Sequence, residues 1–309
     1  QTWGSSPFQI GSKMIINEQG NFLGSVSGGC VETSVITECQ ELIKNKNSFK
    51  KIDFKVSDEN AWDVGLACGG EMTIFIEQKL MKIQTYKEII KEKLSNEQFA
   101  VLTNLSNGSS EIFKLGIPIS KNFINYKNEI ENYHNLKKNG IIDGTEIFIQ
   151  NYIKPVEVII VGAVHITQYL IEFLKDLNFN ITVIDPREYF VTKQKFQNIK
   201  IINKWPEEFF KKIKTSSNTA LITLTHDPKI DEPALKNALK QKFFYIGALG
   251  SKKTHEKRCK RLKEDGFSDE EIGLIHGPIG IKLGGKSAPE IALSIVAQLI
   301  SETNKYKTI

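Results

Sequence analysis

Short apolar runs separated by polar turns fill the chain up to about residue 155. Their alternating or helical spacing distinguishes strands from helices. Strands are predicted at 13–17, 21–27, 51–56, 71–77, 99–106, 109–115 and 145–153, and helices at 31–44 and 86–94. The dipeptide Asn107-Gly108 is a strong hairpin turn between two of these strands. Residues 119–142 are polar and indicate no element. We therefore expect a mixed α/β domain, largely antiparallel, over residues 1–154.

After Pro155 the pattern changes to strands that alternate with helices. The run 156–161 is continuously apolar, which is typical of a strand buried on both faces. Further strands are predicted at 181–185, 200–203, 219–225 and 243–249, with a helix at 168–177 after the first strand. The last helix opens with a capping box, Ser287 and Glu290. This alternation predicts a Rossmann-like, doubly wound parallel sheet over residues 155–309 and places the whole chain in the α/β class.

Composition narrows the class of protein. Of 309 residues, 40% are hydrophobic and 25% charged, values typical of a globular protein with a substantial core. The net charge of +5 is mild and does not indicate nucleic-acid binding. No apolar run approaches the roughly 18 residues of a membrane span, and no secretory signal opens the sequence. The four cysteines fit neither a disulfide scaffold nor a CxxC zinc site. We expect a cytoplasmic protein with free thiols.

The first turn of the second domain is a candidate dinucleotide site. Gly162 begins the turn, but Val164 stands where the usual fingerprint has its central glycine. Asp185 ends the second strand 23 positions after Gly162, where a ribose-binding carboxylate belongs, and Arg187 is placed to meet a 2′-phosphate. His165 lies in the same turn. The pattern fits either NAD(P) binding or a Rossmann domain that is kept for packing or for another ligand.

Other candidates follow later strands, because ligands bind at the carboxyl ends of parallel strands. His226 follows the fourth strand, and Ser251 and Lys252 open a helix after the fifth, where backbone N–H groups and positive charge would bind an anion. The helix 252–263 holds seven basic residues and one acidic residue, which is also the composition of an ordinary solvated face. His226 is equally compatible with a structural, hydrogen-bonded role. The spacing of the five histidines does not suit a stable metal site.

Paired glycines beside a cysteine occur twice in the first domain. Gly28, Gly29 and Cys30 precede the helix at 31–44, and Cys68, Gly69 and Gly70 precede the strand at 71–77. Such glycine pairs mark places where the backbone turns tightly or approaches another group closely. Both cysteines are also compatible with a structural role, Cys30 as a small buried residue at a helix start. Cys39 and Cys259 are expected to be structural.

Several ordered motifs together resemble the XdhC/CoxI family of xanthine dehydrogenase accessory proteins. They are "TWGSSPFQIGSKM", "GSVSGGCVE", "AWDVGLACGGEMTIFIE", "VIDPREYF", "LTHDP", "FYIGALGSKKTH" and "HGPIGIKLGGKSAPEIALSI", which cover both domains. The chain departs from the family pattern at Phe8, where arginine is frequent, and at Val164. The family's first motif normally follows a helix and a strand, so we expect this sequence to be truncated before Gln1.

The resemblance implies a factor that binds molybdenum cofactor, the molybdopterin-chelated metal. The implied protein assists the sulfuration of the cofactor or its delivery to a molybdenum hydroxylase, and acts as a chaperone rather than as an enzyme. Gly28 and Gly29 would then supply N–H donors to the pterin phosphate. Cys68 or Cys30 would contact molybdenum or carry sulfur, with Cys68 the candidate metal contact.

The partners implied are the apoenzyme of the hydroxylase, a cysteine desulfurase and a second copy of the chain, with neither nucleic acid nor membrane. The cofactor-binding residues expected on this interpretation are Gly28, Gly29, Cys30, Cys68, Gly69, Gly70, Gly162, His165, Asp185, His226, Ser251 and Lys252. The alternative is an NAD(P)-dependent oxidoreductase centred on the second domain, with His226 or His165 near the nicotinamide.

Overall fold

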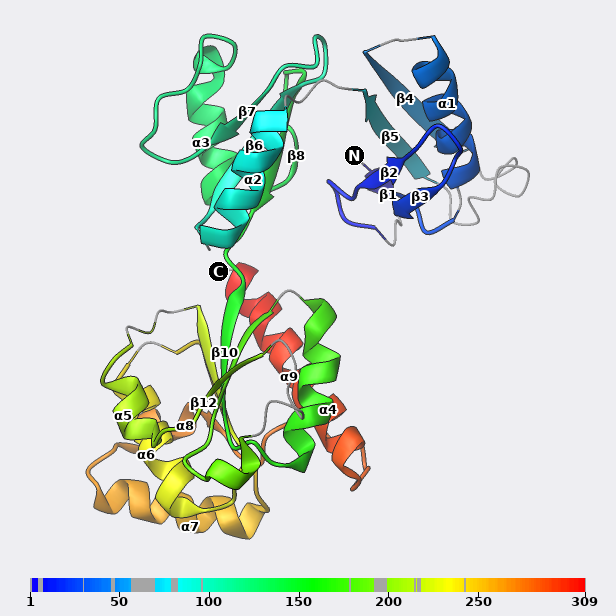
Figure 1. Ribbon diagram of the computed structural model, residues 1–309. Helices are drawn as coiled ribbons and strands as arrows, with labels where there is room; N and C mark the ends of the chain where they lie inside the picture. The colour runs from blue at the N-terminus through cyan, green and yellow to red at the C-terminus, as the bar shows by residue number, and fades with distance from the viewer. Residues whose placement is uncertain are drawn as a thin grey trace. The chain divides into compact units, whose positions relative to one another are not determined.

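The structure of the protein, a computed structural model, separates the chain into two compact units, Gln1–Lys154 and Pro155–Ile309 (Figure 1). It describes residues 2–4, 8–29, 31–45, 48–56, 70–78, 83–95, 97–177, 179–191, 199–213, 215, 218–241 and 243–308. In this part of the chain no helix is both long and apolar enough to cross a membrane.

A helix packed on a small antiparallel sheet forms the first part of unit 1. The elements are β1 (Thr2–Gly4), β2 (Met14–Ile16), β3 (Phe22–Gly24), α1 (Glu32–Lys44), β4 (Phe49–Val56) and β5 (Gly70–Glu77). The sheet has the order β1-β5-β4, and β2 and β3 form a separate hairpin. Val35 and Leu42 of α1 pack against Met72, Ile74 and Ile76, the alternate residues of β5. The apolar face of the helix and the apolar face of the strand therefore pack in one core, as the sequence pattern predicts.

The second part of unit 1 is a four-stranded antiparallel sheet with a helix on each face. The elements are α2 (Ile83–Ser95), β6 (Phe99–Asn104), β7 (Ser110–Phe113), the 3-10 helix η1 (Ile124–Tyr126), α3 (Lys127–Asn135), β8 (Gly140–Ile141) and β9 (Ile147–Tyr152). The strand order is β7-β6-β9-β8. Along β6, Ala100 and Leu102 pack with Ile130 of α3, and Phe99 and Val101 pack with Ile89 of α2.

One segment of unit 1 differs from the expectation. Residues 119–142, which show no pattern in the sequence, contain η1, α3 and β8. The residues of this segment that join the core are Ile119, Phe123, Ile130, Tyr133 and Ile142, and the polar residues between them hide the helical period.

Unit 2 is a doubly wound sheet of six parallel strands, which confirms the predicted Rossmann fold. Its elements are β10 (Val156–Val161), α4 (His165–Leu174), η2 (Lys175–Leu177), β11 (Phe179–Ile184), η3 (Glu188–Phe190), β12 (Lys200–Ile202), α5 (Pro206–Phe210), β13 (Thr219–Thr223), α6 (Pro228–Leu239), β14 (Tyr245–Ala248), α7 (Lys252–Glu264), α8 (Asp269–Gly273), β15 (Ile275–His276) and α9 (Ala288–Thr308). The order β12-β11-β10-β13-β14-β15 places the change of winding direction between β10 and β13.

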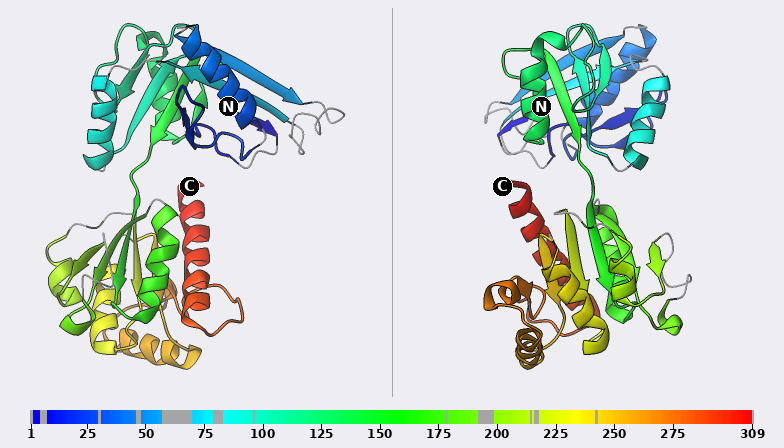
Figure 2. Two further views of the ribbon diagram at one scale, coloured as in Figure 1. Left: turned by 45° about the vertical axis from the view of Figure 1, so that its right-hand side comes forward. Right: turned by 90° about the vertical axis from the view of Figure 1, so that its left-hand side faces the viewer.

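Helices cover both faces of this sheet (Figure 2). α4 and α9 pack on one face, where Leu170 and Leu299 join the core, and α5 and α6 pack on the other, where Phe209 and Leu235 do so. At the start of α9 the Glu290 carboxylate accepts the Ser287 N–H at 3.0 Å, as the predicted capping box requires. The sixth strand, β15, has only two residues and is too short for its period to be visible in the sequence.

Candidate functional site

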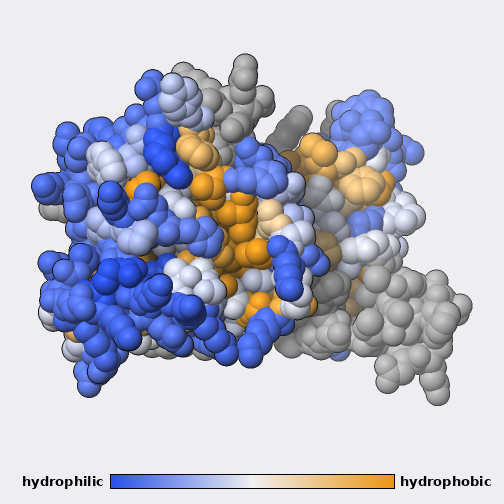
Figure 3. Space-filling view, turned by 90° about the horizontal axis from the view of Figure 1, so that it is seen from below, coloured by the Kyte–Doolittle hydropathy of each residue, from blue (hydrophilic) through white to orange (hydrophobic). Residues whose placement is uncertain are grey.

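The turns that follow β10, β11, β13 and β14 meet at the carboxyl edge of the parallel sheet, the usual ligand-binding edge of this fold. Figure 3 views unit 2 from the side toward which β10 runs. Apolar side chains gather there in a strip between two hydrophilic flanks. The edge therefore combines an apolar surface with the polar side chains of the surrounding turns.

Gly162 brings the first turn close to the turn after β13. It has a φ of +116°, and a Cβ at this position would lie 2.8 Å from Cγ2 of Thr225. The N–H of Ala163 donates to Oδ2 of Asp185 at 2.8 Å, and Oγ1 of Thr167 donates to the Gly162 carbonyl at 2.5 Å. Glycine is needed here because both the backbone conformation and the space exclude a side chain.

Asp185 is fully buried, and both of its carboxylate oxygens have partners inside the protein. Oδ1 accepts the backbone N–H and the Nε–H of Arg187, each at 2.9 Å, and Oδ2 accepts Nη2–H at 2.7 Å in addition to the Ala163 N–H. Hydrogen bonding to Asp185 raises the pKa of Arg187, and the guanidinium also lies 4.2 Å from the ring centre of Phe190. A ribose hydroxyl or a 2′-phosphate would have to compete with this ion pair.

The turn after β13 is organised by a second buried carboxylate, Asp231. Oδ1 accepts the N–H of Thr225 at 3.2 Å and its hydroxyl at 2.7 Å, and Oδ2 accepts the N–H of His226 at 3.1 Å. Burial raises the pKa of Asp231 despite these bonds. His226 has a φ of +62°, a left-handed conformation that is unfavourable for a residue with a side chain. Asp231 thus holds His226 in a strained position, next to the threonine that Gly162 approaches.

A buried cation that the motifs did not indicate donates to the turn after β14. Arg258 of α7 is only 3% exposed, and its Nη2 donates to the carbonyl of Leu249 at 2.9 Å. Burial lowers the pKa of Arg258, while the charge of Asp231 opposes this shift. The one hint in the sequence is that Arg258 and Leu262 lie four residues apart, so they share a helix face that is buried.

In the anion site predicted at the start of α7, a side chain of the protein already binds one of the backbone N–H groups. Ser251 caps α7, and its hydroxyl accepts the Thr254 N–H at 3.1 Å. Lys252 is exposed in the first turn. His165 begins α4 and packs edge to face with Tyr169 at 5.1 Å between ring centres. The structure therefore places Gly162, Asp185 and His226 in contact-linked turns, His165 at the start of α4, and Ser251 and Lys252 at the start of α7.

In unit 1 the loop 25–29 wraps around the carboxylate of Glu32. Backbone N–H groups of Ser27 and Gly29 donate to it at 2.9 Å, those of Val26 and Gly28 at 3.1 and 3.2 Å, and the hydroxyls of Ser25 and Ser27 donate as well. Burial alone would raise the pKa of Glu32, but these bonds outweigh it and hold the pKa well below its ordinary value.

This loop changes the interpretation of the first glycine pair. The N–H donors of Gly28 and Gly29, predicted to face a phosphate, bind the protein's own carboxylate. Gly28 and Gly29 have φ values of 82° and 118°, so the pair is required for the turn itself. The bond from Gly29 to Glu32 spans three residues, as in a capping box, and that spacing is the signal by which Glu32 could have been found.

Gly70 lies within the sheet of unit 1, opposite Gly4 of β1 and Val56 of β4. Cys30, Cys68 and Gly69 lie outside the described residues. Cys39 is half-buried, and burial raises the pKa of its thiol. Across the described ranges, no group of three or more His, Cys, Asp or Glu side chains is arranged to hold a metal ion.

The fold and the glycine-bearing turns define a two-unit protein in which a Rossmann domain follows a mixed α/β unit. The family described as the XdhC Rossmann domain matches residues 158–299, and the XdhC and CoxI family matches residues 1–53. The chain belongs to the XdhC/CoxI family, as its motifs predict.

Two curated relatives match nearly the whole chain. One, from Bacillus subtilis, is described as a probable xanthine dehydrogenase subunit; it is 25% identical over 100% of this chain and 93% of its own length. The molybdenum cofactor insertion chaperone PaoD from Escherichia coli is 26% identical over 96% of this chain and 80% of its own length. A solved structure from Bacillus halodurans, described as a xanthine dehydrogenase, has the same fold: its TM-score is 0.81 at 24% identity, covering 99% of this chain and 90% of that one.

Proposed function

We propose that this protein binds molybdenum cofactor as cargo and assists its sulfuration or its insertion into a molybdenum hydroxylase of the xanthine dehydrogenase type. The observation that carries this proposal is the similarity to a molybdenum cofactor insertion chaperone, which extends over 96% of the chain and so includes both units. A match confined to the Rossmann unit would support only a shared nucleotide-binding fold. On this proposal the protein acts in the cytoplasm and does not itself oxidise a purine.

The geometry of unit 2 favours this function over NAD(P)-dependent oxidation. A dehydrogenase of this fold presents a carboxylate to the ribose and backbone N–H groups to the pyrophosphate. Here the carboxylate of Asp185 already binds Arg187 and the N–H of Ala163. Val164, at the N-cap of α4, stands where the dinucleotide fingerprint has its central glycine. Both features oppose dinucleotide binding. The carboxyl edge of the sheet is nevertheless rich in polar groups, and we assign it to another ligand.

Within this proposal the predicted residues keep separate roles. Cys68 and Cys30 are the soft ligands that would contact molybdenum or carry sulfur, since thiolates suit both tasks. Gly162, His226 and Lys252 belong to the cargo-binding edge of unit 2. The partners proposed are the hydroxylase apoenzyme, which receives the cofactor, a cysteine desulfurase, which supplies sulfur, and a second copy of this chain.

Purification from cells that synthesise molybdopterin tests the function. Pterin, molybdenum and nucleotide bound to the protein are measured together, and cells unable to make molybdopterin provide the control. We expect pterin and molybdenum in comparable amounts, little nucleotide, and increased activity when the loaded protein is added to a hydroxylase apoenzyme. Bound NAD(P) without pterin, together with no effect on the apoenzyme, would contradict the proposal.

A further inference from the structure

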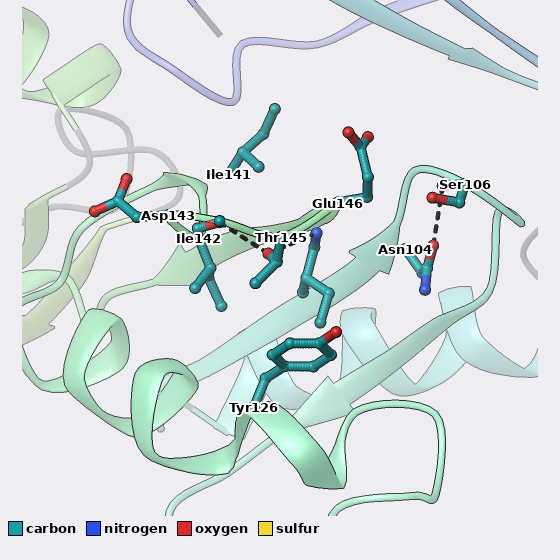
Figure 4. A pocket seen from close by; sticks show the side chains of 10 residues that line it. Asn104, Ser106, Tyr126, Ile141, Ile142, Asp143, Thr145 and Glu146 are labelled. Atoms are coloured by element: carbon teal, nitrogen blue, oxygen red, sulfur yellow. Dashed lines mark hydrogen bonds between the residues drawn. The ribbon is translucent and has the colours of Figure 1, made fainter.

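The surface of unit 1 contains a hollow of about 660 Å³ beside Tyr126, lined also by the turn 141–147 (Figure 4). In that view the Glu146 carboxylate lies on the opposite side of the turn from the Tyr126 ring, and its Oε2 is 3.4 Å from Nζ of Lys51. The charged and aromatic groups of the hollow therefore do not converge on one ligand. A stronger concentration of charge is found on unit 2, along the helix α7.

The thirteen residues of α7 carry as much net charge as the whole chain. Seven lysines and arginines stand against two glutamates, Glu256 and Glu264, which gives the helix a net charge of +5. The net charge of all 309 residues is also +5, so the remainder of the chain is neutral in sum. α7 begins directly after β14, at the carboxyl edge of the sheet, and Figure 1 shows it at the end of unit 2 toward which β10 runs.

Four of the seven basic side chains of α7 are exposed and without an acidic partner. Arg258 is buried, Arg261 pairs with Glu232 at 2.5 Å, and Lys263 pairs with Asp269 at 2.5 Å. Within the described ranges, no carboxylate forms an ion pair with the other four, which we call the basic face: Lys252, Lys253, Lys257 and Lys260. The last three follow one another at intervals of four and three residues, so they lie on one side of the helix.

The basic face is unfavourable for the helix that carries it. The start of a helix has a partial positive charge, yet the first turn of α7 contains Lys252 and Lys253 and no acidic residue. Lys257 lies four residues after Lys253 and three before Lys260, so like charges are neighbours. The next helix, α8, has the favourable arrangement, with three acidic residues in its first turn. An arrangement that opposes the local rules is typical of a surface that is used for binding.

The chemistry of the basic face fits an acidic protein surface. Glu256 lies among the lysines, so the continuous phosphates of a nucleic acid would meet a carboxylate within the same contact. A membrane-binding helix presents apolar side chains beside its lysines, whereas Leu262 of α7 is buried in the core of unit 2. A protein surface can place separate carboxylates opposite the lysines and a basic group opposite Glu256.

We propose that the basic face of α7 is the surface on which an acidic surface of the hydroxylase apoenzyme docks. This inference rests on the proposed function, and it identifies the chemistry of the partner's surface. The cofactor has to pass from one protein to the other, and α7 begins at the carboxyl edge that the proposed function assigns to the cargo. Docking on α7 brings the receiving protein to that edge, and opposite charges increase the rate of encounter.

Binding to the apoenzyme of a xanthine dehydrogenase-type hydroxylase, purified from cells unable to make molybdopterin, tests this surface by biolayer interferometry. We expect the double variant Lys253→Glu/Lys257→Glu to bind about tenfold more weakly than wild type, because two attractive charges become repulsive. Wild-type binding should also weaken as salt rises from about 0.1 M to about 1 M, which shortens the Debye length from about 10 Å to about 3 Å.

The matched control is Lys87→Glu/Lys91→Glu, which reverses two exposed lysines at the same spacing on α2. It should leave the affinity for the apoenzyme unchanged. Since Lys253→Glu removes an unfavourable charge from the start of α7, its double variant should unfold at or above the wild-type temperature, so that weaker binding does not reflect a loss of folding. Equal apoenzyme affinities of the two double variants, or apoenzyme binding that salt does not change, would overturn the proposal.

Purification from molybdopterin-making cells separates this surface from the proposed function. Lys253→Glu/Lys257→Glu should retain as much pterin and molybdenum as wild type; loss of the cofactor would assign the lysines to the cargo and overturn the docking surface. Salt-sensitive apoenzyme binding that depends on Lys253 and Lys257 supports the docking surface, even where wild-type protein retains no pterin and the cofactor role fails. A short DNA duplex is the second probe, and lysine-dependent binding to it without binding to the apoenzyme would also overturn the proposal.

Discussion

The guanidinium of Arg187 holds both carboxylate oxygens of Asp185, with Nε 2.9 Å from Oδ1 and Nη2 2.7 Å from Oδ2. The partners are close neighbours in the sequence, yet Asp185 is fully buried and the side chain of Arg187 is 33% exposed. The pair lies where a dinucleotide-binding Rossmann domain presents a free carboxylate to the ribose. This ion pair therefore affects both the stability of unit 2 and the ligands that the carboxyl edge of its sheet can bind.

Arg187→Ala should destabilise unit 2 by about 3 kcal/mol, because it leaves a buried carboxylate without its cation. Arg187→Lys should fall between wild type and the alanine variant, since lysine keeps the charge but cannot make the paired contact. Thermal unfolding followed by circular dichroism measures both. An alanine variant that unfolds at the wild-type temperature would show that the pair contributes nothing to stability.

NAD and NADP should bind weakly to the wild-type protein, because Val164 and the Asp185–Arg187 pair both oppose them. Val164→Gly should strengthen binding by about 1 kcal/mol, since it removes the side chain that hinders pyrophosphate approach. Calorimetric titration of both proteins decides the matter. Tight wild-type binding that the glycine variant leaves unchanged would restore the oxidoreductase hypothesis.

Glu32→Gln should loosen the loop 25–29 and lower the free energy of unfolding at pH 7. Because the pKa of Glu32 is depressed in the folded protein, its charge stabilises the fold above the pKa of the unfolded chain. That contribution declines as the pH falls below about 5 toward the folded-state value. The difference between wild type and Glu32→Gln should therefore shrink on acidification.

Amide hydrogen exchange of residues 27–29, measured at pH 7 and at pH 4, follows the effect of Glu32 locally. Glu41→Gln, an exposed carboxylate on the same helix, is the control and should leave exchange unchanged. A pH-independent difference between wild type and Glu32→Gln would contradict the electrostatic explanation.

His226→Gly should stabilise unit 2 by up to about 1 kcal/mol, because glycine adopts the positive φ at this position without strain. If His226 contacts cargo, the same variant should retain less pterin from molybdopterin-making cells. His226→Ala keeps the strain and serves as the comparison. Higher stability with unchanged pterin content would assign His226 a purely conformational role.

Cys68→Ser should lower cofactor retention or hydroxylase activation without affecting folding, if its thiolate contacts molybdenum or carries sulfur. Cys39→Ser should do neither, because Cys39 is a half-buried thiol in α1 whose pKa is raised by burial. Pterin and molybdenum contents of the two variants are compared. Equal behaviour would assign Cys68 a structural role.

The sequence by itself determined the order of the elements and the class of fold. Periods of two and of 3.6 residues record which side of a segment is buried, and this information is local to each strand and helix. For that reason the continuous apolar run 156–161 and the alternating run 71–77 were assigned correctly, together with the doubly wound sheet. The motifs likewise led to the correct family.

Only the tertiary structure decided which groups are free to bind a ligand. The N–H donors of Gly28 and Gly29, and the carboxylate of Asp185, carry the chemistry that their motifs suggest, but Glu32, Arg187 and Ala163 already occupy them. The burial of Arg258 and the hollow beside Tyr126 depend in the same way on how separate segments pack. Hydrogen bonds between separate strands, turns and helices form only when the fold brings their partners together. The spacing of apolar residues within one segment carries no information about the distance from that segment to another.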